Sequence, residues 1–155
     1  MKNNPITFQF ISEPSDVNYG GNVHGGSVMK WIDQAGYACA STWSGSYSVT
    51  VYVGGIRFYQ PIKIGDIVKV EAHVIYTGST SMHIAINVYS RDLKKKNFEK
   101  RTHCIIVFVA IDENGKAIMV PKWQPKTAEE LRQERYAIRL MELRKQIENE
   151  MKPFL

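Results

Sequence analysis

The sequence predicts an α+β domain in which an antiparallel sheet accompanies one central helix. A helix-like segment follows the first strand-like segment, four long strand-like segments come next, and a charged helix closes the chain. With 155 residues, 44% of them hydrophobic, the chain has room for one domain with a real core. No apolar run approaches a membrane span and the first residues lack the apolar core of a signal peptide, so we expect a cytoplasmic protein.

The first part of the chain contains one strand, a loop and a helix. Residues 6–11 alternate enough for a strand, and residues 12–25 are rich in Gly, Asn, Pro and Asp, which favour turns. The apolar spacing that follows predicts a helix from Gly26 to about Thr42.

Four long strands are expected after this helix. Residues 48–59 are rich in Val, Tyr and Thr, and Gly54 with Gly55 predicts a bulge or bend within them. Residues 66–76 alternate apolar and polar side chains, which is typical of a sheet with one dry face. Residues 82–91 and 101–112 complete the series, and the turn-forming residues 113–116 follow the last strand.

A separate C-terminal helix is predicted after Pro125, which divides the chain into a domain at 1–125 and a helix at 126–155. Thr127 and Glu130 have the spacing of a capping box. An apolar stripe then recurs at helical spacing, at Tyr136, Leu140, Leu143, Ile147 and Met151. We expect this stripe to pack on the domain or on a neighbouring subunit, with lipid binding as the alternative.

Charge and cysteine content narrow the possible partners. The net charge of +5 favours polyanionic partners, and Lys94–Lys96 with Lys100 and Arg101 forms either a solvated hairpin loop or a contact for a nucleotide phosphate. The sequence contains no recognisable nucleic-acid-binding motif. Cys39 and Cys104 lack metal-ligand spacing, so we expect two small buried residues and no structural zinc.

The segment from Asn18 to Gly36 is the strongest candidate for a functional site. A glycine-rich loop lets backbone N–H groups approach a ligand closely, and Gly25 and Gly26 lie where the helix begins, at its free N–H groups and positive dipole end. At about 100° per residue, Asp33 lies near the line of Gly26, so we expect the carboxylate and the helix N-terminus to face one cleft.

The helix that carries Asp33 has apolar residues on both sides, which predicts that it is buried all round. One side comprises Val28, Trp31, Ile32, Ala35 and Cys39, and the other comprises Met29, Gly36, Tyr37 and Ala40. A buried carboxylate is costly unless it is paired or faces a cavity, so Asp33 is a candidate functional group. The alternative is a partly exposed helix edge, where Asp33 lies beside Lys30 and Gln34.

Several motifs form one combined pattern along residues 6–125. It begins with Asn18, Gly21, Gly25 and Gly26, with Asp33 seven residues later, and it continues through Val49-Thr50-Val51, Phe58 with Pro61, Gly65-Asp66, the segment 78–82, the segment 109–116 and Val120-Pro121. In this order the motifs resemble the acyl-CoA hydrolase branch of the hotdog-fold thioesterases. The charged tail is similar to the C-terminal helix of long-chain members.

This resemblance implies a hotdog fold, in which a curved antiparallel sheet wraps one long central helix. It implies side-by-side dimers with active sites at their interface, commonly built into a trimer of dimers, so that one chain holds half a site. The implied reaction is hydrolysis of acyl-CoA thioesters to free fatty acid and CoA. No cofactor is implied, because CoA is part of substrate and product, and neither nucleic acid nor membrane insertion is expected.

The resemblance also assigns roles to residues. Asp33 would be the catalytic carboxylate, either as general base on water or as nucleophile through an anhydride. Backbone N–H groups near Gly25 and Gly26 would form the oxyanion hole. Asn18 would orient the water or bind the carbonyl, opposite Asp33 of the partner subunit, whereas its alternative role is that of an ordinary turn asparagine.

Weaker candidates surround these residues. His24 is either a proton carrier or a hydrogen-bonded structural histidine, and Thr50 either assists the water or is a plain strand residue. The polar turn formed by Gly78, Ser79, Thr80 and Ser81 is a candidate site for CoA phosphates. Family members often have Arg where Ser79 stands, so Arg91 and the lysine-rich loop are candidate substitutes.

Two other functions share the fold. A hotdog hydratase or dehydratase needs a paired histidine and acid, which His24 and Asp33 fit poorly. A non-catalytic acyl-CoA sensor needs an attached regulatory segment, which the sequence does not obviously supply.

Overall fold

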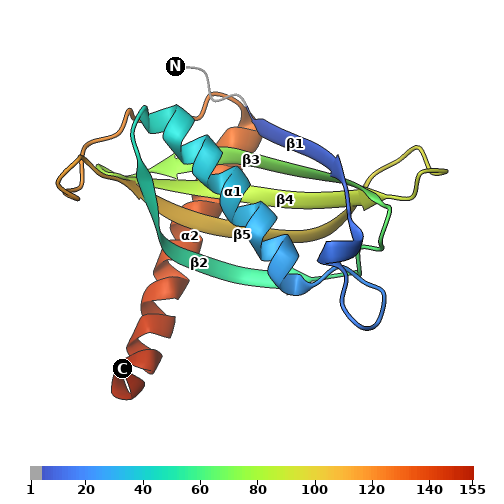
Figure 1. The fold of residues 1–155 in the computed structure, drawn as a ribbon. Coiled ribbons are helices and arrows are strands. Elements are labelled where there is room, and N and C mark those ends of the chain that lie inside the picture. Colours follow the sequence, from blue (N-terminus) through green and yellow to red (C-terminus); the bar gives the residue numbers. More distant parts are fainter. Residues whose placement is uncertain (1–4) are drawn as a thin grey trace.

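The protein forms a five-stranded antiparallel sheet with one helix on each face, as the computed structural model of residues 5–155 shows (Figure 1). The elements in chain order are β1 (Ile6–Ile11), α1 (Gly25–Ser44), β2 (Ser48–Phe58), β3 (Ile67–Thr77), β4 (Ser81–Arg91), β5 (Glu99–Ala110) and α2 (Ala128–Met151), with short 3₁₀ turns at Pro14–Asp16 and Lys152–Phe154. The α+β class and the order of elements predicted from the sequence are confirmed.

The sheet has the order β1-β3-β4-β5-β2, so β2 is an edge strand although it is second in the chain. Strand β4 is buried over most of its length, β3 alternates buried and half-buried residues, and β5 is exposed only at its first two residues, because α1 covers one face and α2 covers part of the other (Figure 1). We call the α1 side the inner face and the α2 side the outer face. The main core lies between α1 and the inner face.

A bulge in β2 changes which way its side chains point. Thr50 pairs with Phe108 of β5, whereas Tyr52 pairs with the preceding residue, Val107, so Val51 is an extra residue in β2. Phe108 belongs to the inner core and Val107 lies on the outer face. Thr50 therefore faces inward and Tyr52 faces outward, although two residues spaced by two would share a face in a regular strand. The predicted irregularity at Gly54 and Gly55 is also present, as a second shift in pairing.

Helix α1 is longer than predicted and lies very close to the sheet. It continues to Ser44 and ends at Gly45, whose φ of 70° is the left-handed conformation that glycine favours at helix C-termini. A Cβ atom at Gly36 would lie 2.8 Å from the ring of Phe108, so only glycine permits this approach without rearrangement. The absence of a side chain at Gly36 sets how closely the middle of α1 approaches β5.

The expectation that α1 is buried all round is wrong for the single chain. Its inner side is buried, but Met29 is 48% exposed, and Lys30, Asp33, Gln34 and Tyr37 are exposed with it. The reason is topological, because one sheet can cover only one side of a helix. The apolar residues on the other side are left uncovered.

Helix α2 begins as its cap predicts but is covered only in its first half. The Thr127 side chain accepts a hydrogen bond from the Glu130 N–H at 3.0 Å. Ala137 is 1% exposed and packs with Ile75, Ala85 and Ile105 of the outer face. Ile147 and Met151, further along the predicted stripe, are about half exposed. None of the helices within residues 5–155 is long and apolar enough to cross a membrane.

Candidate active site

Asp33 and Thr50 meet at the open side of α1. The Thr50 hydroxyl donates a hydrogen bond to the Asp33 carboxylate, with 3.0 Å between Oγ1 and Oδ1. Asp33 lies in the middle of α1 and Thr50 lies on the edge strand β2, and both side chains are exposed in the single chain. A hydroxyl that donates to one carboxylate oxygen fixes the carboxylate's orientation and leaves its other oxygen free to accept a proton or attack a carbon.

Local packing produces this contact. Gly36, one helical turn beyond Asp33, lets α1 lie against Phe108, and Phe108 is the partner of Thr50 in the β2–β5 ladder. The inward orientation of Thr50, which precedes the bulge at Val51, then directs its hydroxyl toward the helix. The Thr50 side chain thus has a specific carboxylate partner, in addition to its place in the β2–β5 ladder.

Asn18 forms the turn that precedes α1. Its side-chain oxygen accepts hydrogen bonds from the N–H groups of Gly20 at 2.9 Å and Asn22 at 3.3 Å, and its backbone N–H donates to the Asn22 carbonyl. This is the turn arrangement that the sequence offered as the alternative to catalysis. The same bonds hold the carboxamide in place through its oxygen, and its NH₂ group has no partner within residues 5–155. Asn18 is therefore an oriented donor as well as a turn residue.

The N-terminus of α1 is open. His24 is the N-cap residue, but its side chain makes no capping hydrogen bond, and its ring is exposed. The first intrahelical bond runs from Val28 N–H to the His24 carbonyl, so the N–H groups of Gly25 and Gly26 have no helical acceptor. A Cβ at Gly26 would meet no atom within 4 Å in the single chain. The space in front of these donors can admit a ligand or a neighbouring subunit.

One chain does not bring these groups into a single cleft. Asn18 and Gly25 line a depression with Phe58 of β2, and Asp33 does not belong to it. From Gly26, Asp33 is seven residues along the helix, about 10 Å at 1.5 Å per residue. The expectation that the carboxylate and the helix N-terminus share one cleft is therefore not met within one chain, because a shared line on a helix does not make two residues neighbours.

The candidate CoA-binding residues lie at opposite ends of the sheet. The backbone of the turn at Gly78–Ser81 is engaged in structure, since the carbonyl of Ser79 accepts from Val120 N–H and that of Thr80 accepts from Ala110 N–H. Arg91 is ten residues further along β4, about 33 Å away at the usual rise of a strand. Its guanidinium donates to the Lys95 carbonyl and lies over the Phe98 ring. Arg91 cannot substitute for Ser79 within one chain.

Both cysteines are buried, as predicted, and burial raises the pKa of each thiol to about 12. Neither is a nucleophile at neutral pH. Within residues 5–155 no group of three metal-ligating side chains lies together.

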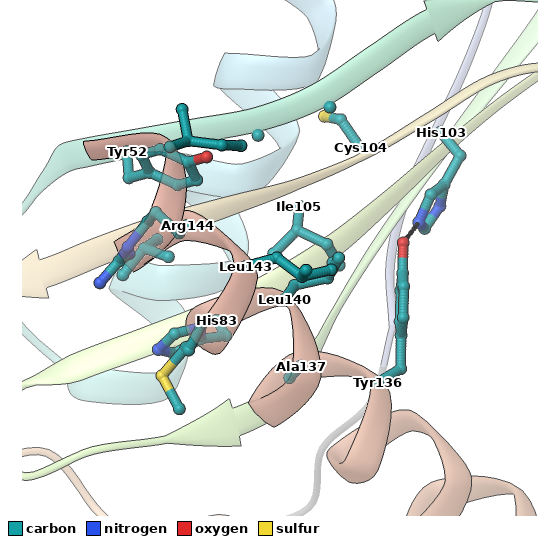
Figure 2. Close-up of a pocket in the computed structure, with 15 residues that line it drawn as sticks. Tyr52, His83, His103, Cys104, Ile105, Tyr136, Ala137, Leu140, Leu143 and Arg144 are labelled. Atoms are coloured by element: carbon teal, nitrogen blue, oxygen red, sulfur yellow. Dashed lines mark hydrogen bonds between the residues drawn. The ribbon is translucent and has the colours of Figure 1, made fainter. Parts of the chain in front are cut away.

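The outer face holds a second cavity that sequence reasoning did not find. It lies beneath α2 and is lined by His83, His103, Tyr136 and Leu140 among others (Figure 2). His103 bonds to Asn87 through Nδ1 at 2.7 Å and to the Tyr136 hydroxyl through Nε2 at 2.9 Å. The only indication in the sequence is that His83 of β4 and His103 of β5 are polar residues at strand positions that face away from the core. Helix α2 covers these two positions.

Comparisons with known proteins identify the family. The family model described as thioesterase superfamily matches residues 20–96. Protein VdlD of Helicobacter pylori is 31% identical over 139 residues, which cover 90% of this chain and 79% of that protein. Acyl-CoA thioester hydrolase YciA of Salmonella typhimurium is 30% identical over 127 residues, which cover 78% of this chain and 96% of that protein. The chain belongs to the hotdog-fold thioesterase superfamily.

Solved structures agree over nearly the whole chain. An apo hexameric acyl-CoA thioesterase is 31% identical, with a TM-score of 0.88 over 92% of this chain and 91% of the other. An acyl-CoA hydrolase from Staphylococcus aureus, solved with butyryl coenzyme A, is 28% identical, with a TM-score of 0.89 over 97% of this chain and 92% of the other. That hydrolase has also been solved with an asparagine, an aspartate or a threonine replaced by alanine, at positions separated by 15 and then 17 residues.

Proposed function

We propose that this protein hydrolyses acyl-CoA thioesters and that Asp33 is its catalytic carboxylate. The observation that carries the proposal is the Thr50–Asp33 hydrogen bond on the open face of α1, since it orients a carboxylate that makes no ion pair within residues 5–155. Asn18, Asp33 and Thr50 are separated by the same 15 and 17 residues as the three positions replaced in the Staphylococcus aureus hydrolase. That agreement supports a common set of functional residues.

We infer that the active site is completed by a second copy of the chain. Among the described strands, β2 pairs only with β5, so its other edge is unpaired there, and Val51 and Val53 are exposed along it. On the adjoining face of α1, Met29 and Tyr37 are also exposed. An unpaired edge strand flanked by apolar side chains favours pairing with an identical strand about a two-fold axis. Such pairing would extend the sheet and cover the open side of α1.

In this dimer, Asp33 of one subunit would face Asn18 and the α1 N-terminus of the other. The separation of Asp33 from Asn18 within one chain agrees with this arrangement, since the two groups would otherwise have to meet across the length of α1. Hexameric relatives are known for several members of the family, so a trimer of dimers is the expected complete assembly.

The proposed reaction uses water as the nucleophile. Asp33 accepts a proton from water while the water oxygen attacks the thioester carbonyl carbon. Negative charge develops on the carbonyl oxygen, where the free N–H groups of Gly25 and Gly26 and the positive end of α1 stabilise it. The carbon–sulfur bond then breaks, CoA leaves as the thiol after protonation, and the fatty acid is released. Direct attack by Asp33 to form an anhydride is the second route.

The other residues take supporting roles in this proposal. The Asn18 NH₂ group donates to the attacking water or to the substrate carbonyl, and Thr50 positions Asp33. The exposed ring of His24, at the cap of α1, is near enough to the glycines to carry a proton. The CoA phosphates are proposed to bind at the Ser79–Ser81 turn or at Arg91 with the lysine-rich loop. These two sites are distant in one chain, but different subunits can bring them to one substrate. A cytoplasmic location remains a prediction.

A hotdog hydratase or dehydratase is the alternative enzyme, and it needs a histidine and an acid that act on one substrate. Within one chain His24 caps the helix nine residues before Asp33, about 13 Å along its axis, so these two residues do not act together there. An acyl-CoA sensor would bind the same ligand without turnover.

The decisive experiment measures free thiol released from acyl-CoAs of chain lengths from acetyl to palmitoyl. The proposal expects turnover with at least one substrate and loss of nearly all turnover in Asp33→Asn, which keeps the size and the Thr50 hydrogen bond. Binding of acyl-CoA without release of thiol would assign the protein as a sensor instead.

A further inference from the structure

The C-terminal part of α2 carries an apolar surface that the single chain leaves uncovered. Ala137, Leu140, Arg144, Ile147 and Met151 lie on one side of the helix at spacings of three and four residues. Exposure rises along this side, from 1% at Ala137 to about half at Ile147 and Met151 and 88% at Phe154. One continuous stripe therefore starts on this chain's own sheet and ends in the open.

The stripe becomes exposed where α2 passes the edge of the sheet. The Arg144 guanidinium lies 4.8 Å from the centre of the Tyr52 ring, and Tyr52 projects from the edge strand β2. Figure 1 shows the C-terminal turns of α2 continuing past β2 and away from the sheet. From Arg144 to Met151 the helix advances about 10 Å, which is the width of about two further strands. We call residues 145–155 the α2 tail.

The cavity beneath α2 described above reaches the point where α2 crosses β2. It is about 240 Å³ in volume, and it is bounded by the outer side of Tyr52, Gly54 and Gly55 and by the facing side of α2 (Figure 2). A Cβ at Gly54 would lie 2.8 Å from the Tyr52 ring, so glycine is needed for that ring to lie along the strand. The single chain thus has a cavity and an uncovered apolar tail at the same edge.

We propose that the α2 tail of each subunit crosses the β2 edge and packs on the outer face of a second copy, against that copy's α2 and Tyr52. This rests on the proposed function in one respect, the pairing of two β2 strands. If the sheets join at β2, a tail that overhangs by two strands must lie over the neighbouring subunit. By two-fold symmetry each subunit then gives a tail and receives one.

Charge agrees with a second copy as the occupant. The α2 tail carries Lys145 and Lys152 against Glu148 and Glu150, so these side chains sum to zero, and two such tails side by side do not repel one another. A helix adapted to an anionic lipid surface would instead carry excess basic residues on its polar side. Exposed apolar residues are present both on the tail, at Ile147 and Met151, and on the β2 edge, at Val51 and Val53.

The test compares two double variants with equal charge change on opposite sides of the tail. Ile147→Asp with Met151→Asp alters the apolar stripe, and Gln146→Asp with Asn149→Asp is the matched control on the other side. Self-association is measured by sedimentation equilibrium, helix content by circular dichroism, and thiol release is followed at concentrations above the dissociation constant.

The proposal expects the stripe variant to raise the dissociation constant about 100-fold, since symmetry places four altered side chains in each dimer, while the control changes it less than threefold. Unchanged self-association of the stripe variant would overturn the proposal. Vesicle binding that depends on Ile147 and Met151, with unchanged self-association, would overturn it in favour of a lipid surface. Wild-type protein that associates through the tail but releases no thiol would contradict the proposed activity alone.

Discussion

Thr50 on the edge strand and Asp33 on the central helix are joined by a 3.0 Å hydrogen bond, although they are far apart in the chain and lie on different elements. The contact depends on a glycine at position 36, which sets the helix against β5, and on a bulge at Val51, which separates the inward side chain of Thr50 from the outward one of Tyr52. A carboxylate held in this way is oriented by its hydroxyl partner in the single chain.

Removing the Thr50 hydroxyl tests that positioning role. Thr50→Val keeps the shape of the side chain and is expected to lower kcat by about 10- to 100-fold, as loss of a hydrogen bond to a charged group costs about 1.5–3 kcal/mol. Thr50→Ser, which retains the hydroxyl, should keep most of the activity. Equal rates for the two variants in a steady-state thiol-release assay would show that Thr50 only packs in the strand.

A mixing experiment tests whether the site is shared between subunits. Asn18→Ala and Asp33→Asn are each expected to be nearly inactive alone. When the two are unfolded together and refolded, half of the dimers are mixed and each mixed dimer has one intact site of two, so about a quarter of wild-type activity should return. Each variant refolded by itself is the control. No recovery, despite mixed dimers in native mass spectra, would place both residues in one chain's site.

Stability should fall in mild acid because of a histidine on the outer face. His83 is 3% exposed, and burial together with nearby Arg144 lowers its pKa to about 4. A folded-state pKa below the unfolded value means that the neutral ring favours folding above about pH 6.5, and that this stability is lost as the pH falls toward 4.

The expected loss from this group is at most about 3 kcal/mol between pH 6.5 and 4. His83→Gln should reduce the difference in unfolding free energy between pH 7 and pH 4.5, measured by urea denaturation followed by circular dichroism. A pH dependence identical to wild type would show that His83 does not titrate in this range.

Two glycines of α1 should respond in opposite ways to alanine. Gly36→Ala places a methyl group 2.8 Å from the Phe108 ring, and overpacking of about 1–3 kcal/mol exceeds the gain of up to about 1 kcal/mol in helix propensity. Its melting temperature should fall. Gly26→Ala meets no atom within 4 Å, so its melting temperature should be unchanged or higher. Thermal scans at one protein concentration make the comparison, and equal shifts would contradict the packing account.

The sequence predicts the helices and strands well, but it does not predict which of their faces are buried. Alternation in residues 66–76 and the turn-forming residues 113–116 follow local rules, and the ends of the strands are predicted to within two residues. The burial of α1 was overestimated, because apolar residues on both sides of a helix do not reveal which side its own chain covers and which side is left open. Met29 and Tyr37 remain exposed for this reason.

The candidate site likewise has parts that sequence spacing predicts and parts that depend on packing. The combined spacing of Asn18, Gly25, Gly26 and Asp33 indicates the candidate region, but the contact between Thr50 and Asp33 depends on a bulge and a close helix approach that spacing does not encode. The separation of Ser79 from Arg91 follows from strand length alone and could have been predicted. The cavity beneath α2 could not, because it arises where the C-terminal helix happens to cross the sheet.

Because of the extra residue at Val51, side chains before and after it in β2 that are two residues apart point to opposite faces of the sheet. Before it, β2 directs Thr50 to the inner face, where its hydroxyl meets the Asp33 carboxylate, and just beyond it β2 directs Tyr52 to the outer face. Loss of this one residue would exchange the faces of every side chain on one side of the bulge, so that either the carboxylate loses its hydroxyl partner or the outer face loses its aromatic ring. A relative with a regular β2 would have to orient its carboxylate, or pack its C-terminal helix, through other contacts. The side of the bulge on which such a relative is one residue shorter would show which of the two contacts it lacks.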